Sequence, residues 1–362
     1  MIRMLCVSPA HVLTAFILKE VYFQNKNLGI VLLDYHPNAR KMYDQLKKFQ
    51  DFAEVRFIKA KKIWKKSALQ NDKIFNLWFF TREESYLKKL GIDISDTEQF
   101  LFPYRDPIAA LMTKCITARG KRCIFSYYDD GTAPYYDANN VISTKPARLE
   151  LLLRVPLRYY VPQSAYMFSP EMSGLENEIK TYKIRTPKNK EFFDKINQYY
   201  GYQSYEERKY IVFDQCGNYE GSREDMDEVN KLLEIVGNVV DKKQAYVKKH
   251  PRRSLKIYEE SGWDIFPLLQ EIPYEVSLLN SDKIEEQVMM ADFSASLTMP
   301  KQLFDYEPTV IFLYRLINIA FTTEKQVQLD CVVNNLRDMY REKDKVFVPE
   351  TLEQLSEFIN KL

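Results

Sequence analysis

The chain has few residues of several kinds, and each shortage excludes a class of protein. It has only three histidines, so any mechanism that needs an imidazole is restricted to His11, His36 and His250. Its five cysteines are odd in number and form no CxxC pair, which argues against a disulfide framework and a structural zinc site. This cysteine usage is typical of a reducing compartment.

Long apolar runs and a strong net charge are also missing. No stretch reaches the roughly 20 apolar residues of a membrane-spanning helix, and the beginning, with its polar break at Ser8-Pro9, makes a poor signal peptide. We therefore expect a cytoplasmic protein. Lysine and arginine number 52 against 50 acidic residues, a balance that argues against a nucleic-acid binder. Dinucleotide, P-loop and HExxH motifs are absent, so nicotinamide, ATP-hydrolysing and zinc-protease functions lose their usual support.

What is present is an α/β pattern long enough for about two domains, with 362 residues of which 46% are hydrophobic. In the first half, short apolar runs alternate with stretches of helical spacing, which predicts a parallel sheet with helices on both faces. The predicted strands are Met4–Val7, Ile30–Leu33, Val55–Ile58, Ile74–Phe79 and Cys123–Tyr127. The predicted helices are Ala39–Phe49, Arg82–Leu90 and Pro107–Arg119.

A second alternating series follows a lysine-rich passage, Lys180–Lys190, which we interpret as a linker. Its predicted strands are Tyr210–Asp214, Ala245–Lys248, Val288–Phe293 and Val310–Leu313, and its predicted helices are Glu191–Tyr200, Asp225–Val236 and Pro349–Leu362. We therefore expect two Rossmann-like domains, 1–185 and 186–362, that face a central cleft. Ligands of such sheets bind beyond the carboxyl ends of the strands, so the strand ends are the places to search for chemistry.

The first notable strand end carries two adjacent carboxylates, Asp129 and Asp130, followed by Gly131. Repulsion between neighbouring like charges raises the pKa of one carboxyl group, which suits a general base. The same residues are also typical of an ordinary Asp-Gly turn after a strand.

The second strand end carries His250 followed by Pro251. Proline favours an extended conformation at the residue before it, so the imidazole can point steadily into a cleft. The nearby cations are Lys248, Lys249, Arg252 and Arg253. They would attract a phosphate, to which an imidazolium can donate a proton. A solvated basic loop with an incidental histidine is the alternative interpretation.

The third strand end is rich in hydroxyl groups, with Ser294, Ser296 and Thr298 before an expected helix. Hydroxyls and free backbone N–H groups at a helix start can bind an anion, although serine and threonine are also ordinary N-caps. Between the second and third strand ends, Pro273 is expected to open a helix in which Glu275 can accept hydrogen bonds from ribose hydroxyls or serve as a routine first-turn glutamate.

Taken together and in this order, these motifs resemble the bacterial sialyltransferases of glycosyltransferase family 52, the lipooligosaccharide sialyltransferases, and their capsular polysialyltransferase relatives. The shared pattern is an acidic pair before glycine, then His-Pro, then a Ser/Thr-rich segment. Here it is carried by Asp129-Asp130-Gly131, His250-Pro251 and 294–298, with Pro273-x-Glu275 as a further donor-site element.

The resemblance implies a GT-B fold and an inverting, metal-independent transfer of sialic acid from CMP-sialic acid to a terminal galactose-type hydroxyl of a surface glycan. No cofactor is implied. Asp130 would be the base, Asp129 the fallback base, and His250 the acid or hydrogen-bond donor to the departing phosphate. Ser294, Ser296 and Thr298 would hold the phosphate and Glu275 the ribose, and Gly131 and Pro273 belong to the same expected donor site. Gln215, which follows the predicted strand Tyr210–Asp214, can contribute an amide to donor or acceptor. At the position of His11 such chains are expected to have glutamine. His11 can contact donor or acceptor, but a histidine at a helix start is more often structural, and we favour that interpretation.

Other interpretations stay open. A GT-B enzyme using CMP-Kdo or a UDP-sugar would keep the fold, and a non-catalytic glycan-binding assembly protein would not need the acidic pair. The resemblance also allows a homodimer. A basic stretch with Ile63 and Trp64, Lys59–Lys66, has the composition of a segment that rests peripherally on the inner face of the cell membrane, or of a solvated helix face.

Overall fold

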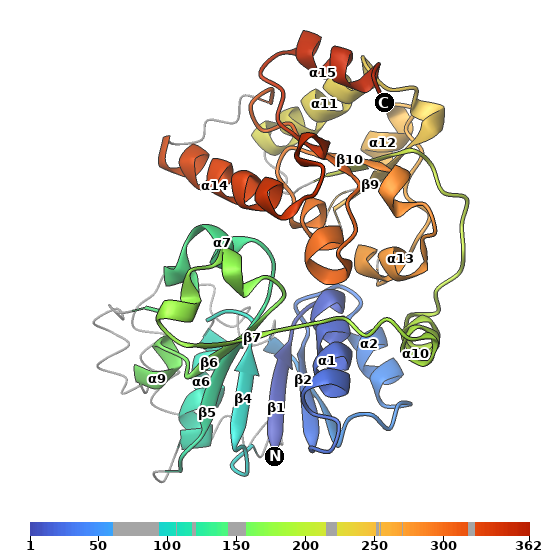
Figure 1. The fold of residues 1–362 in the computed structure, drawn as a ribbon. Helices are drawn as coiled ribbons and strands as arrows, with labels where there is room; N and C mark the ends of the chain where they lie inside the picture. The colour runs from blue at the N-terminus through green and yellow to red at the C-terminus, as the bar shows by residue number, and fades with distance from the viewer. Residues whose placement is uncertain are drawn as a thin grey trace. The chain divides into compact units, whose positions relative to one another are not determined.

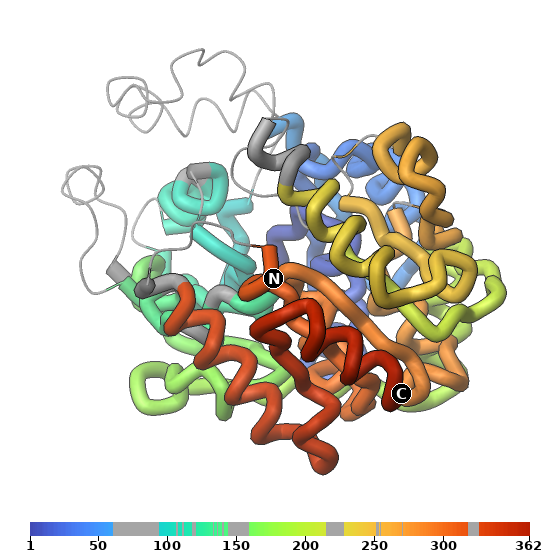
Figure 2. The backbone as a smooth tube through the Cα atoms, turned by 90° about the horizontal axis from the view of Figure 1, so that it is seen from above, coloured from blue at the N-terminus to red at the C-terminus, as the bar shows by residue number. Residues whose placement is uncertain are grey.

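A computed structural model describes residues 1–60, 94–105, 107–117, 121–143, 157–214, 223–250, 253, 255–269, 271–317 and 323–362. The described parts of the chain are coloured in Figure 1 and in Figure 2. They divide into two compact units, Met1–Tyr200 (unit 1) and Gly201–Leu362 (unit 2). Each unit is an α/β structure built on its own parallel sheet.

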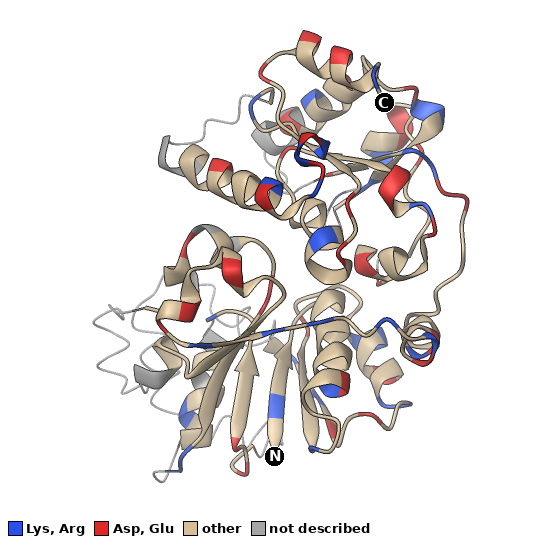
Figure 3. Cartoon of the chain, viewed as in Figure 1, with Lys and Arg blue, Asp and Glu red and all other residues tan. Residues whose placement is uncertain are grey.

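Unit 1 contains a seven-stranded parallel sheet in the order β3-β2-β1-β4-β5-β6-β7 (Figure 1). Its strands are β1 (Ile2–Cys6), β2 (Leu28–Leu33), β3 (Glu54–Ile58), β4 (Gln99–Phe102), β5 (Ile124–Tyr128), β6 (Ser164–Met167) and β7 (Lys180–Lys183). The strands β1 and β2 are buried along their whole length, as expected for parallel strands covered on both faces. Figure 3 shows the same property, since the central strands of this sheet carry few charged residues.

The helices of unit 1 follow its strands. They are α1 (Pro9–Val21), α2 (Ala39–Leu46), α6 (Pro107–Thr117), α7 (Ala133–Tyr136), α9 (Leu157–Tyr160) and α10 (Lys190–Tyr200). Side chains of α6 such as Ile108 and Met112 pack in one cluster with Leu5, Phe100 and Phe125 of the sheet. Burial of this apolar cluster is the main stabilising contribution on that face.

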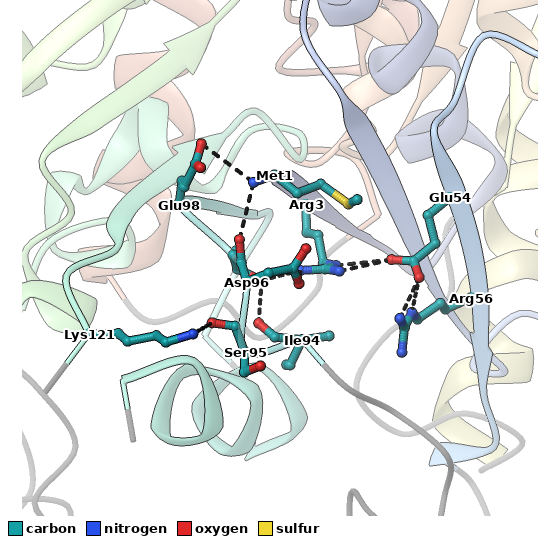
Figure 4. A network of polar contacts seen from close by, with 10 residues as sticks. Met1, Arg3, Glu54, Arg56, Ile94, Ser95, Asp96, Glu98 and Lys121 are labelled. Carbon is teal, nitrogen blue, oxygen red and sulfur yellow. Dashed lines mark hydrogen bonds and ion pairs between the residues drawn. The ribbon is translucent and has the colours of Figure 1, made fainter. Parts of the chain in front are cut away.

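One polar network lies inside this otherwise apolar sheet (Figure 4). Arg3, on β1, has a side chain only 2% exposed, and it forms ion pairs with Glu54 (3.1 Å) and Asp96 (2.7 Å). Its Nη1 also donates to the hydroxyl of Thr97 at 2.6 Å. A buried guanidinium is tolerated only when its charge and its donors are matched in this way.

The division between the units falls after Tyr200, whereas the sequence predicts it after residue 185. The reason is the packing of α10 on unit 1. The Tyr199 ring contacts that of Phe16 with centroids 5.1 Å apart, and the Tyr200 hydroxyl donates to the carbonyl of Pro9 at 2.7 Å. The helix therefore completes the first unit, and Gly201, with φ of 64°, begins the second.

Unit 2 contains a five-stranded parallel sheet in the order β12-β11-β10-β8-β9. Its strands are β8 (Tyr210–Phe213), β9 (Ala245–Lys248), β10 (Val288–Ala291), β11 (Thr309–Phe312) and β12 (Val346–Phe347). Its α-helices are α11 (Arg223–Gly237), α12 (Lys256–Glu260), α13 (Tyr274–Asn280), α14 (Thr323–Met339) and α15 (Leu352–Ile359). Val212, Val247, Met290 and Ile311 of the sheet form one core cluster with Leu233 of α11.

The α/β fold expected from the sequence is confirmed, and the structure adds strands that the sequence analysis missed. These are β4, β6, β7 and β12. The passage interpreted as a linker begins with β7, an edge strand whose Tyr182 ring stacks on Tyr166 at 4.9 Å. Because its sequence is Lys-Thr-Tyr-Lys, it lacks the apolar run typical of a buried strand.

Some predictions cannot be compared with the structure. The predicted elements Ile74–Phe79 and Arg82–Leu90 lie outside the described residues, as does nearly all of the basic stretch Lys59–Lys66. Within the described ranges, none of the helices has both the length and the apolar character needed to traverse a bilayer.

Candidate active site

The carboxyl edge of the unit 1 sheet brings two sequence-distant segments together. The strand order reverses between β1 and β4, because the chain runs from β1 to β2 and β3 on one side and continues through β4 on the other. Ligand sites of open α/β sheets lie at such a reversal. The segments after β1 and β5 reach this edge and carry His11 and Asp130.

His11 is held at the start of α1 by the local sequence. Ser8 caps the helix by accepting the His11 backbone N–H at 3.2 Å, and Pro9 occupies the first turn. The imidazole is buried, with Nδ1 accepting the backbone N–H of Val7 at 3.2 Å. Because Nδ1 is an acceptor, a neutral imidazole here carries its hydrogen on Nε2.

The other ring nitrogen of His11 faces Asp130. Its Nε2 forms a short contact with Oδ1 of Asp130, whose side chain is 32% exposed. The tautomer set by Val7 makes Nε2 the donor and the carboxylate the acceptor. Gly131, with φ of 97°, provides the left-handed conformation that turns the chain after Asp130. One carboxylate oxygen is thus held by His11 in a residue that solvent and ligands can reach.

Asp129 lies next to Asp130 but has a different environment. Its Oδ2 accepts hydrogen bonds from the Tyr135 hydroxyl and from the backbone N–H of Phe168, the latter at 3.1 Å. Burial raises the pKa of its carboxyl group to about 7, against the lowering effect of the Tyr135 hydrogen bond. The residue is 4% exposed, so this carboxyl group acts as an internal anchor for the segment after β6.

The strand order of unit 2 reverses between β8 and β10, so the segments after β8, β9 and β10 leave the same edge of that sheet. The first carries Asp214 and the second His250. Oδ2 of Asp214 accepts the His250 backbone N–H at 3.3 Å and the Tyr258 hydroxyl at 2.5 Å. Gln215 and Pro251, two residues of the expected site, lie outside the described part of the chain.

The cationic surroundings expected for His250 are different in the structure. Arg253 is buried and pairs with Asp214 at 2.6 Å. The Nζ of Lys249 donates to the backbone carbonyl of Arg253 at 3.0 Å, and burial lowers its pKa. Burial lowers the pKa of Lys248 as well, and nearby Glu275 opposes that shift. Arg252 lies outside the described residues. The charges of Lys249 and Arg253 are therefore engaged within unit 2.

The three hydroxyl residues after β10 have unequal environments. Ser294 is buried, and its Oγ accepts the backbone N–H of Ser296 at 3.3 Å. Thr298 is fully buried, with its Oγ1 2.9 Å from the carbonyl of Ala295 and 2.9 Å from Oε1 of Gln302. Ser296 is partly exposed, and its hydroxyl has no partner within the described residues. It is the hydroxyl of this segment that is free to meet a ligand.

The helix expected after these hydroxyls is replaced by two shorter elements. Ala295–Leu297 forms a single 3-10 turn, and Pro300–Phe304 forms a π-helix. The π-helix is held by Lys301, whose Nζ lies 2.5 Å from Oε1 of buried Glu307. This segment therefore does not offer the regular helix start whose free backbone N–H groups were expected to bind an anion. The Ser296 hydroxyl is the group of the expected site that can still contact one.

The donor-site element Pro273-x-Glu275 lies at the start of α13. Pro273 occupies the N-cap position, one residue earlier than the first-turn position expected from the sequence. Glu275 lies in the first turn and is close enough to Lys248 to act on its pKa. These residues therefore belong to the same edge as β9.

Two residues have contacts that the sequence does not predict. His11, which we interpret from the sequence as structural, contacts Asp130; its position five residues beyond the end of β1 was the available signal. Asp214 directly follows the apolar strand β8 and was noted only for its neighbour Gln215. No group of three or more histidine, cysteine, aspartate or glutamate side chains in the described ranges is arranged to hold a metal ion.

Comparison with known proteins shows the fold. No protein-family model and no curated protein matches the chain. Arabidopsis thaliana UGT89C1 complexed with quercetin is similar with a TM-score of 0.52 at 9% identity, over 99% of this chain and 90% of that one. The glycotransferase of kitacinnamycin has a TM-score of 0.49 at 12% identity, over 100% and 90% of the chains. UDP-GlcNAc 2-epimerase from Neisseria meningitidis has 0.46 at 10%, over 99% and 98%.

Identities this low concern the fold alone, because one fold can support many activities. The two parallel sheets with interleaved helices have the arrangement of the GT-B glycosyltransferase fold. The chain therefore adopts a GT-B type fold.

Proposed function

We propose that this chain is a GT-B glycosyltransferase, and specifically an inverting, metal-independent sialyltransferase that uses CMP-sialic acid. The observation that carries the proposal is the contact between His11 and Asp130 at the carboxyl edge of unit 1. An accessible carboxylate held in one orientation by a buried donor is what a general base for a hydroxyl group requires. The choice of CMP-sialic acid as the donor is based on the resemblance of the sequence motifs to those of the bacterial sialyltransferases.

The proposed reaction is a single displacement. The acceptor hydroxyl, of a terminal galactose, attacks the anomeric carbon of sialic acid and loses its proton to Asp130. The bond from that carbon to the phosphate oxygen breaks, and its electron pair leaves with CMP. His250 donates a hydrogen bond or a proton to the departing phosphate, where negative charge develops.

The donor side is assigned to unit 2. Ser296 is our choice among the three hydroxyls for the phosphate, because its hydroxyl has no partner within the described residues. Glu275 would receive the ribose hydroxyls. Ser294 and Thr298 shape this segment through their internal hydrogen bonds. Asp129 is assigned to anchoring, because its carboxyl group is turned inward.

Another activated sugar, such as CMP-Kdo or a UDP-sugar, is compatible with the same fold and the same base. A non-catalytic glycan-binding protein is the alternative from another class. The proposed enzyme is cytoplasmic and acts on a lipooligosaccharide or capsule glycan. It contacts the membrane peripherally through Lys59–Lys66.

The test is release of CMP from CMP-sialic acid by the purified chain in EDTA, with and without lactose as the galactose-terminated acceptor. We expect lactose-dependent release that falls by about 10²–10⁴-fold in Asp130→Ala. Asp194→Asn, an exposed carboxylate on α10, is the matched control and should match the wild type. Release from a UDP-sugar alone would exclude the sialyl donor. Binding of glycans without turnover of any donor would exclude a transferase.

A further inference from the structure

Asp214 is a buried carboxylate at the centre of the unit 2 sheet edge. It directly follows β8, the strand between β9 and β10, and its backbone N–H bonds the carbonyl of Lys248 at 3.1 Å. Its side chain is 1% exposed. A carboxylate removed from water to this extent needs strong donors to remain in place.

Within the described part of the chain, two hydrogen-bond donors and one ion-pair partner of this carboxylate come from the segment that follows β9. A single oxygen, Oδ2, lies 3.3 Å from the backbone nitrogen of His250, 2.6 Å from Nε of Arg253 and 2.5 Å from the hydroxyl of Tyr258. The donors therefore span the segment from the strand end to α12. Asp214 fixes the backbone of His250 directly through its N–H group.

The same segment is closed on itself by two further contacts. The backbone N–H of Arg253 donates to the carbonyl of His250 at 3.0 Å, and Nζ of Lys249 donates to the carbonyl of Arg253 at 3.0 Å. His250 is consequently attached to the sheet through one carboxylate oxygen and to the Arg253 backbone through its own carbonyl. These attachments limit the directions in which the imidazole can point.

We propose that Asp214 is the positioning residue of His250, holding the backbone of His250 so that the imidazole meets the departing phosphate. This inference rests on the proposed function for its catalytic part. A misplacement of about 1 Å in a catalytic group can reduce a rate by about 10²-fold, so the attachment has a measurable effect.

The first experiment observes the imidazoles directly and needs no substrate. The chain has only three histidines, so ¹³C labelling at Cε1 gives three signals, assigned by removing each histidine in turn. We expect Asp214→Asn and Tyr258→Phe to shift or broaden the His250 signal while the His11 and His36 signals stay. Tyr258→Phe keeps the ring and removes one donor, so it serves where Asp214→Asn fails to fold.

The matched control is Tyr314→Phe, which removes the equivalent contact between a buried tyrosine hydroxyl and Asp330 elsewhere in unit 2. It should leave the His250 signal unchanged. A His250 signal that is unchanged in both Asp214→Asn and Tyr258→Phe would overturn the proposal.

The second experiment is a double-mutant cycle on turnover. Asp214→Asn should lower kcat by about 10- to 100-fold with little change in the donor KM. In a His250→Ala background, the same substitution should change kcat less than twofold. Equal losses in both backgrounds would mean a general structural role and would overturn the proposal. A wild type that releases no CMP would contradict the sialyltransferase function, while the histidine signals would still decide the positioning role.

Discussion

His11 and Asp130, which are 119 positions apart in the chain, meet through Nε2 and Oδ1 at the carboxyl edge of one sheet. The backbone N–H of Val7 occupies the other ring nitrogen of His11. The imidazole is therefore a fixed donor toward the carboxylate, and the second oxygen of Asp130 is available for a substrate hydroxyl. Because His11 orients the carboxylate and Asp130 accepts the proton, substitutions of the two residues should affect turnover differently.

Replacing His11 should affect turnover through the orientation of Asp130. We expect His11→Ala to lower kcat by about 10- to 100-fold, because the carboxylate loses the donor that holds it. His11→Gln should recover a substantial part of the loss, because its terminal amide can donate from a similar position. Steady-state rates of CMP release measure both. Equal losses in the two variants would contradict a positioning role, and His36→Ala is the control histidine.

Replacing His250 tests its proposed donation to the departing phosphate. His250→Ala should lower kcat by about 10²–10⁴-fold, the usual contribution of general acid catalysis. Thermal unfolding should show that the variant is folded, because the hydrogen bond from His250 to Asp214 comes from the backbone N–H and survives the substitution. A folded His250→Ala enzyme at nearly the wild-type rate would remove the residue from the mechanism.

The buried carboxyl group of Asp129 should make stability depend on pH. Its pKa is raised from 3.8 to about 7, so the folded state binds more protons than the unfolded state between these values. Its contribution to stability is therefore complete below pH 3.8 and is lost as the pH rises through about 7. The slope approaches about 1.4 kcal/mol per pH unit.

The measurement is the difference in free energy of unfolding between the wild type and Asp129→Asn from pH 4.5 to 7.5. We expect the wild type to lose stability relative to the variant as the pH rises. A difference that stays constant across this range would show that the carboxyl group does not titrate there. Asp194→Asn supplies the exposed control.

The Arg3 network should contribute strongly to the stability of unit 1. Arg3→Ala removes the charge-assisted hydrogen bonds that a buried guanidinium makes to Glu54 and Asp96, and we expect a loss of about 2–3 kcal/mol. The exposed i,i+4 pair of Arg40 and Asp44 is the comparison, since Arg40→Ala should cost about 0–1 kcal/mol. Urea midpoints of the two variants measure the difference. Similar values for both would contradict the buried role.

The sequence predicts the parts of the fold that rest on apolar runs. β1, β2, β3, β5 and the sheet of unit 2 up to β11 follow from short apolar runs separated by helical spacing. β7 could not be predicted in this way, because its side chains are half exposed and its position depends on the stacking of Tyr182 on Tyr166. The boundary at Tyr200 depends on aromatic contacts of α10 that leave no local pattern.

Sequence reasoning about the site follows the same rule. The positions of Asp130, His250 and Ser294 at strand ends follow from local pattern, because a strand's carboxyl end is visible in the sequence. Whether a carboxyl group points into the protein depends on partners far along the chain, such as the Phe168 backbone N–H for Asp129. The turning inward of Arg253 likewise depends on Asp214 and could not be predicted from the basic stretch.

The junction between Tyr200 and Gly201 has a consequence for how such chains diversify. The contacts of α10 end at Tyr200, and the residues assigned to acceptor and donor chemistry fall on opposite sides of that peptide bond. A genetic crossover at this point would exchange one set of chemical groups intact and leave the other untouched. Under the proposed function, acceptor choice and donor choice would then be inherited separately, and each sheet would keep its own core cluster.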